Sequence, residues 1–263
     1  PLWSRGLGDV YKRQALHRQN LAVDIVNTTS DLSAYSLVVA PQQYLLGDEG
    51  AANLSAYVEQ GGNLFISAFS DVVDQDDAFR EGGFIVSLRE VLGVALEDFG
   101  ALVPPESVRS ADSAGEVASH AVPDGPGQSE APLDGPAGRI VGQYFAEELI
   151  VQDAEVLGRF TEGRTAGRAA FTRKRAGAGN GFYLATIPDD AGMTAVLGWL
   201  ASEAGVAAEI PGLPEHVEIA RRGSILTVIN HSAAPIDVDV IGTDMLTGCL
   251  LYTSPSPRDQ RGS

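Results

Sequence analysis

The stretch "YSLVVAPQQYLLGDEGAANLSAYVEQGGNLFISAF", residues 35–69, decides the fold class. It opens with a short apolar run closed by Pro41, which is typical of a strand buried in a parallel sheet. Acidic residues then begin a segment in which Leu54, Tyr57 and Val58 recur at helical spacing, and two glycines end it. A second apolar run follows. Strand, helix and strand in this order predict a parallel sheet with crossover helices.

The same alternation extends outward. "LAVDIVN" (Leu21–Asn27) alternates apolar and polar residues and predicts another strand. "SLREVLG" (Ser87–Gly93) predicts a short helix, and "DDAGMTAVLGWLASEAG" (Asp189–Gly205) an amphipathic one. "AGAGNG" (Ala176–Gly181) supplies glycines for a hairpin turn. We expect an α/β domain, flavodoxin-like or class I glutamine amidotransferase-like, with helices on both faces of a parallel sheet.

Three later regions differ in composition. Residues 103–139 are rich in Pro, Gly, Ser, Asp and Ala, and we expect a long surface excursion there. "IPGLPEH" (Ile210–His216) holds two prolines and is expected to be a linker. "VEIARRGSILTVINHSAAPIDVDV" (Val217–Val240) alternates as an antiparallel β-domain does. We assign 15–209 to the α/β domain, whose first strand is missing if the family resemblance described below holds, 210–216 to the linker and 217–248 to a truncated small antiparallel β-domain.

The two ends of the chain share an origin in DNA rather than in protein. Back-translation of "CLLYTSPSPRD" (Cys249–Asp259) resembles the transposon mosaic end and adapter used to prepare sequencing libraries. The reverse complement of that DNA, in a shifted frame, encodes "SRGLGDVYKRQ" (Ser4–Gln14) letter for letter. We therefore expect residues 1–14 and 249–263 to be adapter-derived and non-native, and we exclude them from fold reasoning.

The chain is strongly acidic. Its formal net charge is −17, and the two ends carry +2 and +1, so residues 15–248 carry −20. Nucleic acid is a poor partner for such a surface. No run of eighteen apolar residues exists, so no membrane segment is expected, and we expect a cytoplasmic protein. GC-rich coding and adaptation to a saline cytoplasm, which screens carboxylate repulsion, both explain the acidity.

Residues that carry chemistry are sparse. The single cysteine, Cys249, lies in the adapter-derived end, so 15–248 offers no thiol nucleophile or disulfide. The turn "QQYLLGDEG" places Asp48 and Glu49 where a phosphate would sit, which argues against a nucleotide or flavin site. We expect no catalytic residue and no cofactor in this chain.

No metal site is expected either. Histidines are scattered without metal-ligand spacing, and the run "SDVVDQDDAF" (Ser70–Phe79) lacks the glycine and the terminal glutamate of a calcium loop. We interpret the run as a solvated loop. We therefore expect no metal-ligand role for His17, His120, His216, His231, Asp71, Asp74, Asp76 or Asp77.

Several segments, in order and at this spacing, resemble the non-catalytic part of family 42 glycoside hydrolases, which are β-galactosidases. One departure is "GGFIVS" (Gly82–Ser87), where that family usually has a Gly-Tyr-Pro-Gly-like turn. The segments that carry the resemblance are "DLSAYSLVVAPQQYLL", "LSAYVEQGGNLFIS", "FREGGF…LREVLGV…EDFGAL", "GQYFAEELIVQDAEVLGRF", "GNGFYLATIPDDAG" and "LTVINHSAAPIDV".

The resemblance implies a parent enzyme in which a (β/α)₈ barrel, outside this chain, carries two catalytic glutamates for retaining hydrolysis of terminal β-galactosides. It implies that the α/β domain assembles a homotrimer, that a β-sandwich follows, and that galactoside binds only through the barrel. Glu97, Glu147 and Glu148 are then given no catalytic role. Phe79, Phe84 and Phe99 lie in a loop-rich region with few helices to cover them, which indicates an interface.

The alternative is a stand-alone amidotransferase-like or flavodoxin-like binding module without enzymatic activity. The gene upstream of Ala15 separates the two hypotheses, because a barrel with two strand-end glutamates supports the first.

Overall fold

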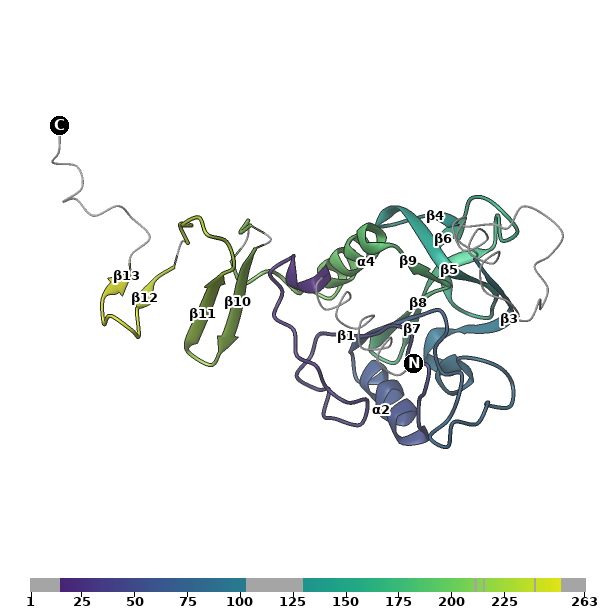
Figure 1. Cartoon of the computed structure of the whole chain (residues 1–263). Helices are drawn as coiled ribbons and strands as arrows, with labels where there is room; N and C mark the ends of the chain where they lie inside the picture. The colour runs from purple at the N-terminus through teal and green to yellow at the C-terminus, as the bar shows by residue number, and fades with distance from the viewer. Residues whose placement is uncertain (1–14, 103–129, 211, 215, 239, 252–263) are drawn as a thin grey trace, which may run out of the picture. The chain divides into compact units, whose positions relative to one another are not determined.

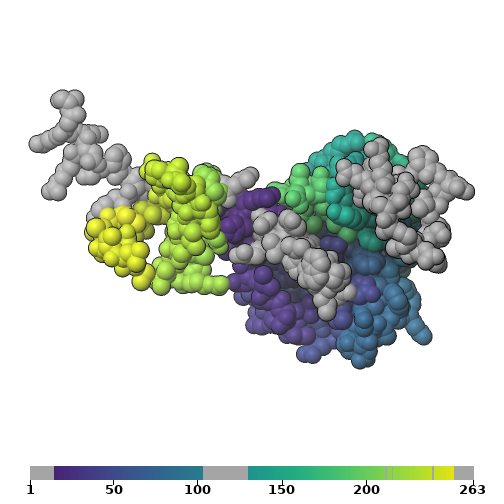
Figure 2. Space-filling model, viewed as in Figure 1, coloured from purple at the N-terminus to yellow at the C-terminus, as the bar shows by residue number. Residues whose placement is uncertain are grey.

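A computed structural model describes residues 15–102, 130–210, 212–214, 216–238 and 240–251. The chain divides into two compact units. The first contains residues 24–206, and Figure 2 shows its purple-to-blue and teal-to-green parts filling one body. The second contains residues 16–23 together with the chain from Ala207 onward. The predicted boundaries at 209/210 and 216/217, and the adapter origin of both ends, stay predictions.

Residues 35–69 fold as their pattern predicts. β1 (Leu37–Ala40) and β2 (Asn63–Ser67) pair in parallel, and α2 (Asp48–Glu59) connects them. Leu54, Tyr57 and Val58 form the buried stripe of α2. β8 (Gly179–Leu184) adds a third parallel strand beside β2. These three strands are the parallel part of the sheet among the described residues.

The rest of the sheet is antiparallel, which corrects the predicted parallel sheet. The nine strands run β1-β2-β8-β7-β6-β4-β5-β3, and β9 also pairs with β5. Connections too short for a crossover force antiparallel neighbours. One is the "AGAGNG" turn, which joins β7 to β8 as predicted, with Gly177 at φ 58°. The additional strands are β3 (Val94–Ala101), β4 (Ala131–Gly135), β5 (Gly138–Val151), β6 (Glu155–Phe160), β7 (Ala169–Ala176) and β9 (Thr186–Pro188).

Helices lie on both faces of the sheet, as expected (Figure 1). Gly181 and Phe182 are consecutive in β8 and therefore face opposite sides. A Cβ on Gly181 would lie 2.1 Å from the Val91 carbonyl, so α3 (Arg89–Leu92), which follows η1 (Val86–Leu88), covers that side. The ring of Phe182 packs on Trp199 of α4 (Asp190–Glu203), with centroids 5.8 Å apart.

Two local predictions were wrong. Residues 21–27 form no strand: Leu21 is buried, but Ile25 is 80% exposed, so the alternation has no continuous buried face. The expected excursion over 103–139 ends early, because Ala131–Gly135 is β4, with Leu133 fully buried between β5 and β6. Pro132 and Gly135 made this strand look like a loop. Residues 103–129 lie outside the described part.

The second unit has a small antiparallel hairpin, as the alternation after residue 217 predicts. β10 (Val217–Arg222) pairs with β11 (Ile225–Asn230), and Val217 is fully buried. β12 (Gly242–Thr243) pairs with the exposed β13 (Leu250–Leu251). Within this unit, the side-chain amide of Asn20 donates to the Leu213 carbonyl at 3.4 Å. No helix in the described residues has the length and apolarity to span a membrane.

Candidate functional site

The carboxyl ends of β1, β2 and β8 are where an open α/β sheet binds its ligands. Here side chains and backbone close that crevice. The backbone N–H of Gln42 donates to Ser67 Oγ at 3.1 Å, and that of Gln43 donates to Ser70 Oγ at 2.9 Å. Ser70 Oγ donates to the Ser67 carbonyl at 2.7 Å. Both serines are fully buried, so these groups join the two strand ends to each other and offer no open cradle.

Phe69 stands at the strand-to-turn position in which this kind of fold can hold a nucleophile. Its φ of 66° is strained for a residue with a Cβ, and such strain often marks active sites. The side chain is a phenyl ring that stacks on Phe145 with centroids 4.8 Å apart. Phe69 therefore combines a strained backbone with a side chain that offers no nucleophile, and acyl-transfer chemistry is excluded at this position.

Glu147 is the most perturbed carboxyl group in the described part of the chain. It lies on β5 and is 1% exposed. Its carboxylate accepts the Phe69 N–H at 2.9 Å and the Tyr183 hydroxyl at 2.5 Å. Burial raises the pKa of Glu147 to about 7, although both hydrogen bonds oppose this. Such a pKa suits a general base, but no substrate atom reaches so buried a group, and its contacts are structural.

Glu147 also raises the pKa of its partner. Burial is the main cause that lifts the pKa of the Tyr183 hydroxyl well above 10, and the neighbouring charge of Glu147 adds to it. Tyr183 therefore stays protonated and acts as a permanent hydrogen-bond donor. One sequence pattern indicates that Glu147 is buried: it lies two residues from Phe145 and two from Leu149, on a mostly apolar strand face.

Asp71 corrects the interpretation of residues 70–79 as a solvated loop. Its side chain is fully buried, and its carboxylate lies 2.8 Å from Arg80 Nε and accepts the Ser87 N–H at 2.8 Å. Asp74 instead accepts the N–H of Asp76 and of Ala78 and closes a turn. The first part of the run, at Asp71, is therefore buried and fixed in the core, and the second part, after Asp74, is an exposed turn. The carboxylate nearest the core is already neutralised by a guanidinium.

No group of three or more His, Cys, Asp or Glu side chains in the described ranges could hold a metal ion. Two of the scattered histidines nevertheless meet one carboxylate in the second unit: Glu218 lies 3.2 Å from His17 and 3.3 Å from His231. His216 accepts the backbone N–H of His231 through its carbonyl. His120 lies outside the described residues. These are local imidazole–carboxylate contacts and do not form a ligand set.

A cluster of aromatic rings covers the strand ends. Phe69 contacts Tyr44, Phe84 and Phe145. Phe99 of β3 extends the cluster to the surface, with its ring centroid 5.3 Å from that of Phe84 and 6.4 Å from that of Phe145. Of the three phenylalanines noted in the sequence, Phe84 and Phe99 therefore meet. Phe79 is 74% exposed and makes none of these ring contacts.

The face of β3 and β5 that lies away from the aromatic cluster carries ion pairs. Glu148 contacts Arg164, and it lies 2.9 Å from Arg168. Arg164 also pairs with Asp98 at 3.2 Å, and Arg168 pairs with Glu97 at 2.9 Å. A Cβ on Gly100 would lie 2.6 Å from the Arg164 guanidinium, which places this network on the side away from Phe99. The edge of the sheet thus has one aromatic and one ionic face.

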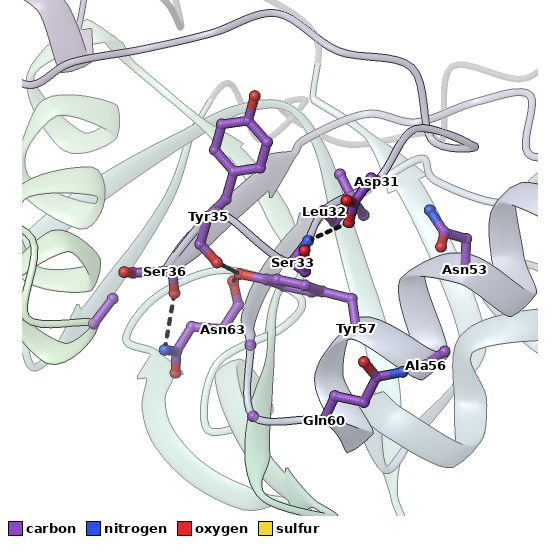
Figure 3. Close-up of a pocket in the computed structure, with 13 residues that line it drawn as sticks. Asp31, Leu32, Ser33, Tyr35, Ser36, Asn53, Ala56, Tyr57, Gln60 and Asn63 are labelled. Atoms are coloured by element: carbon purple, nitrogen blue, oxygen red, sulfur yellow. Dashed lines mark hydrogen bonds between the residues drawn. The ribbon is translucent and has the colours of Figure 1, made fainter. Parts of the chain in front are cut away.

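A hollow of about 440 Å³ lies at the opposite, amino ends of β1 and β2 (Figure 3). The Tyr57 hydroxyl donates to the Tyr35 carbonyl at 2.9 Å, and the Asn63 amide donates to the Ser36 carbonyl at 3.1 Å. Burial raises the pKa of Tyr57 to about 12, so this phenol cannot serve as an acid or a base near neutral pH. The polar groups here hold chain segments together, and the hollow has no catalytic pair.

A family model, curated relatives and solved structures all show similarity between this chain and β-galactosidases. The family model "Beta-galactosidase trimerisation domain" matches residues 10–207. A β-galactosidase of Arthrobacter sp. is 30% identical over 244 residues, which cover 89% of this chain and 31% of the relative. The crystal structure of a β-galactosidase from Bacillus circulans sp. alkalophilus superposes with a TM-score of 0.76 at 26% identity, over 92% of this chain and 34% of that one. The chain spans about a third of the length of these relatives.

Proposed function

The chain belongs to the β-galactosidase trimerisation domain family, and from this premise we propose that it is the non-catalytic assembly part of a retaining β-galactosidase. The parent enzyme would hydrolyse terminal non-reducing β-D-galactosides. Its subunits would form a homotrimer through this domain. The observation that carries the proposal is the family match over 10–207, which includes the Asp24–Val206 part of the first unit.

The side-chain geometry supports a role without chemistry. Retaining glycosidases need two carboxyl groups about 5 Å apart on either side of one sugar bond. Glu147 and Glu148 are consecutive in β5, so they point to opposite faces of the sheet and cannot flank one substrate. Asp71, the other buried acid in the described residues, is held by Arg80 and Ser87. We propose that the catalytic carboxyl groups belong to the part of the parent enzyme that this chain does not span.

Assembly is tested by sedimentation equilibrium on two proteins. The first is the 263-residue chain, whose mass of 27.6 kDa makes multiples easy to recognise. The second is a chimera in which residues 15–207 replace the matching segment of the Arthrobacter β-galactosidase. We expect the chimera to sediment at three times its chain mass and to hydrolyse a chromogenic galactoside. A chimera that folds but stays monomeric, together with a monomeric isolated chain, overturns the proposal.

The absence of catalysis is tested separately. We expect the isolated chain to hydrolyse nitrophenyl β-galactoside no faster than the buffer blank. The parent relative, assayed in parallel, provides the positive control. Turnover that survives repurification and disappears on the single change Glu147→Gln or Glu148→Gln would contradict a non-catalytic role.

A further inference from the structure

We infer that the domain meets a second copy of itself through an aromatic edge, which consists of Phe84, Phe99, Tyr144 and Phe145. The inference rests on the proposed assembly function and adds the surface that performs it. Phe99 is 44% exposed and contacts the half-buried Phe84 and Phe145, and Tyr144, which precedes Phe145 in β5, is 55% exposed. The edge lies beside β3, the terminal strand of the sheet (Figure 1).

Three rings of this edge, those of Phe84, Phe99 and Phe145, are held in place before any partner arrives. Phe99 packs on Phe84 and Phe145, and Phe145 stacks on the half-buried Phe69. Tyr144 sits at a register shift in β5 with a φ of 66°, and its carbonyl accepts the Leu102 N–H at 2.6 Å. Aromatic side chains supply most of the energy at protein interfaces, and rings already locked by packing lose little entropy on binding. Strained backbone that presents an exposed ring is typical of a functional surface.

Charge explains why this edge suits a like-charged partner. A net charge of −17 makes two copies repel each other over most of their surface. Behind the edge, Arg164 and Arg168 pair with Glu97, Asp98 and Glu148, so the local charge is nearly balanced. Two acidic copies can therefore approach there at little electrostatic cost. Ile25 and Phe79 are also exposed, but they make no ring contacts and form no comparable cluster.

The mode of contact is side-chain docking, not extension of the sheet. β3 exposes Glu97 and Asp98 and has a register shift between Leu96 and Asp98. Charged side chains and bulges on an edge strand oppose pairing with another strand. A closed ring of three copies also requires a heterologous interface, in which the edge meets a different patch on its neighbour.

The first test replaces exposed rings by charge. Phe99→Glu and Tyr144→Glu are each compared with Ile25→Glu, a matched control because Ile25 is 80% exposed in the same unit. Self-association is measured by sedimentation in both the chain and the chimera. We expect at least tenfold weaker association for the two edge variants and no change for the control, with all three retaining the wild-type melting profile. Equal association of edge variants and wild type overturns the inference.

The second test distinguishes heterologous docking. Fluorescently labelled Phe99→Glu is mixed with unlabelled wild type. Because the variant keeps the patch that receives the edge, we expect it to bind wild type with near-wild-type affinity while failing to bind itself. A variant that binds neither partner contradicts heterologous docking. If wild type does not associate in either protein, the assembly function itself fails; if only the variants behave as wild type, the function stands and the location is wrong.

Discussion

Glu147 and Glu148 are neighbours in β5, yet their side chains lie on opposite faces of the sheet and in different electrostatic environments. Glu147 is buried beside Tyr183 and Phe69 and forms no ion pair with any residue that the structure describes, and burial raises its pKa to about 7. Glu148 faces the other side and is held by Arg164 and Arg168 at the rim of the solvent. A protein can thus accommodate one buried acid by pairing it with cations and another by favouring its protonated form. We therefore expect the stability of the fold to depend on pH through Glu147 on the aromatic face, and on salt through the ion pairs of the ionic face.

The largest expected effect is on the pH dependence of stability through Glu147. Its folded pKa, about 7, lies above the ordinary value of 4.5, so its stabilising contribution is full below pH 4.5 and is lost as pH rises to 7. The shift corresponds to roughly 3 kcal/mol of unfolding free energy. Glu147→Gln, which keeps the size and an acceptor for the Phe69 N–H, should remove this loss.

Urea unfolding of wild type and Glu147→Gln at pH 5 and pH 8 measures this effect. The variant should be the more stable protein at pH 8 and close to wild type at pH 5. Taking the difference between the two proteins at each pH removes contributions from the other carboxyl groups. Parallel pH curves for the two proteins would contradict a raised pKa at Glu147.

Removing the partner of Glu147 has a smaller effect. Tyr183→Phe deletes the hydroxyl that donates to the carboxylate, and a buried group that loses its hydrogen bond costs about 1–3 kcal/mol. The loss should be greater at pH 8, where the carboxylate is charged. Tyr35→Phe is the matched control, since its exposed hydroxyl reaches Asp24 only at 3.4 Å. Equal losses in both variants would show that the buried bond has no special role.

On the ionic face, Glu148→Gln should cost about 1 kcal/mol, because Arg164 and Arg168 are nearly half exposed and water screens their attraction. Its cost should shrink as sodium chloride is added. The same urea assay at 0.05 M and 1 M salt provides the measurement. A cost that stays the same at both salt concentrations would contradict a stabilising role for these ion pairs.

Salt alone should have the smallest effect, a rise of a few degrees in melting temperature. Between 0.01 M and 1 M the range of charge repulsion falls from about 30 Å to about 3 Å, so most of the gain should come at low ionic strength. Calorimetry across this range on a chain of charge −17 makes the measurement. A constant melting temperature would favour GC-rich coding over salt adaptation as the origin of the acidity.

Local patterns predicted the elements better than their arrangement. The helix over 48–59 and the hairpin at 176–181 follow from apolar spacing and glycine placement within a few residues of sequence. β4 could not be read in this way, because Pro132 and Gly135 signal a loop, and only burial between two strands makes the segment extended. The burial of Asp71 could not be predicted for the same reason. In the sequence Asp71 resembles its solvated neighbours, and only the folded chain brings Arg80 and Ser87 to its carboxylate.

The sequence by itself determined the strand–helix–strand stretch over residues 35–69, the acidic charge and the resemblance to the β-galactosidase family, since each depends on residues in fixed order along the chain. The tertiary structure alone decided which strands are neighbours and which side chains meet. Glu147 bonds to Tyr183 and to Phe69, which are 36 and 78 residues away. Such contacts depend on the register of distant strands, and a shift of one residue would turn every side chain to the other face.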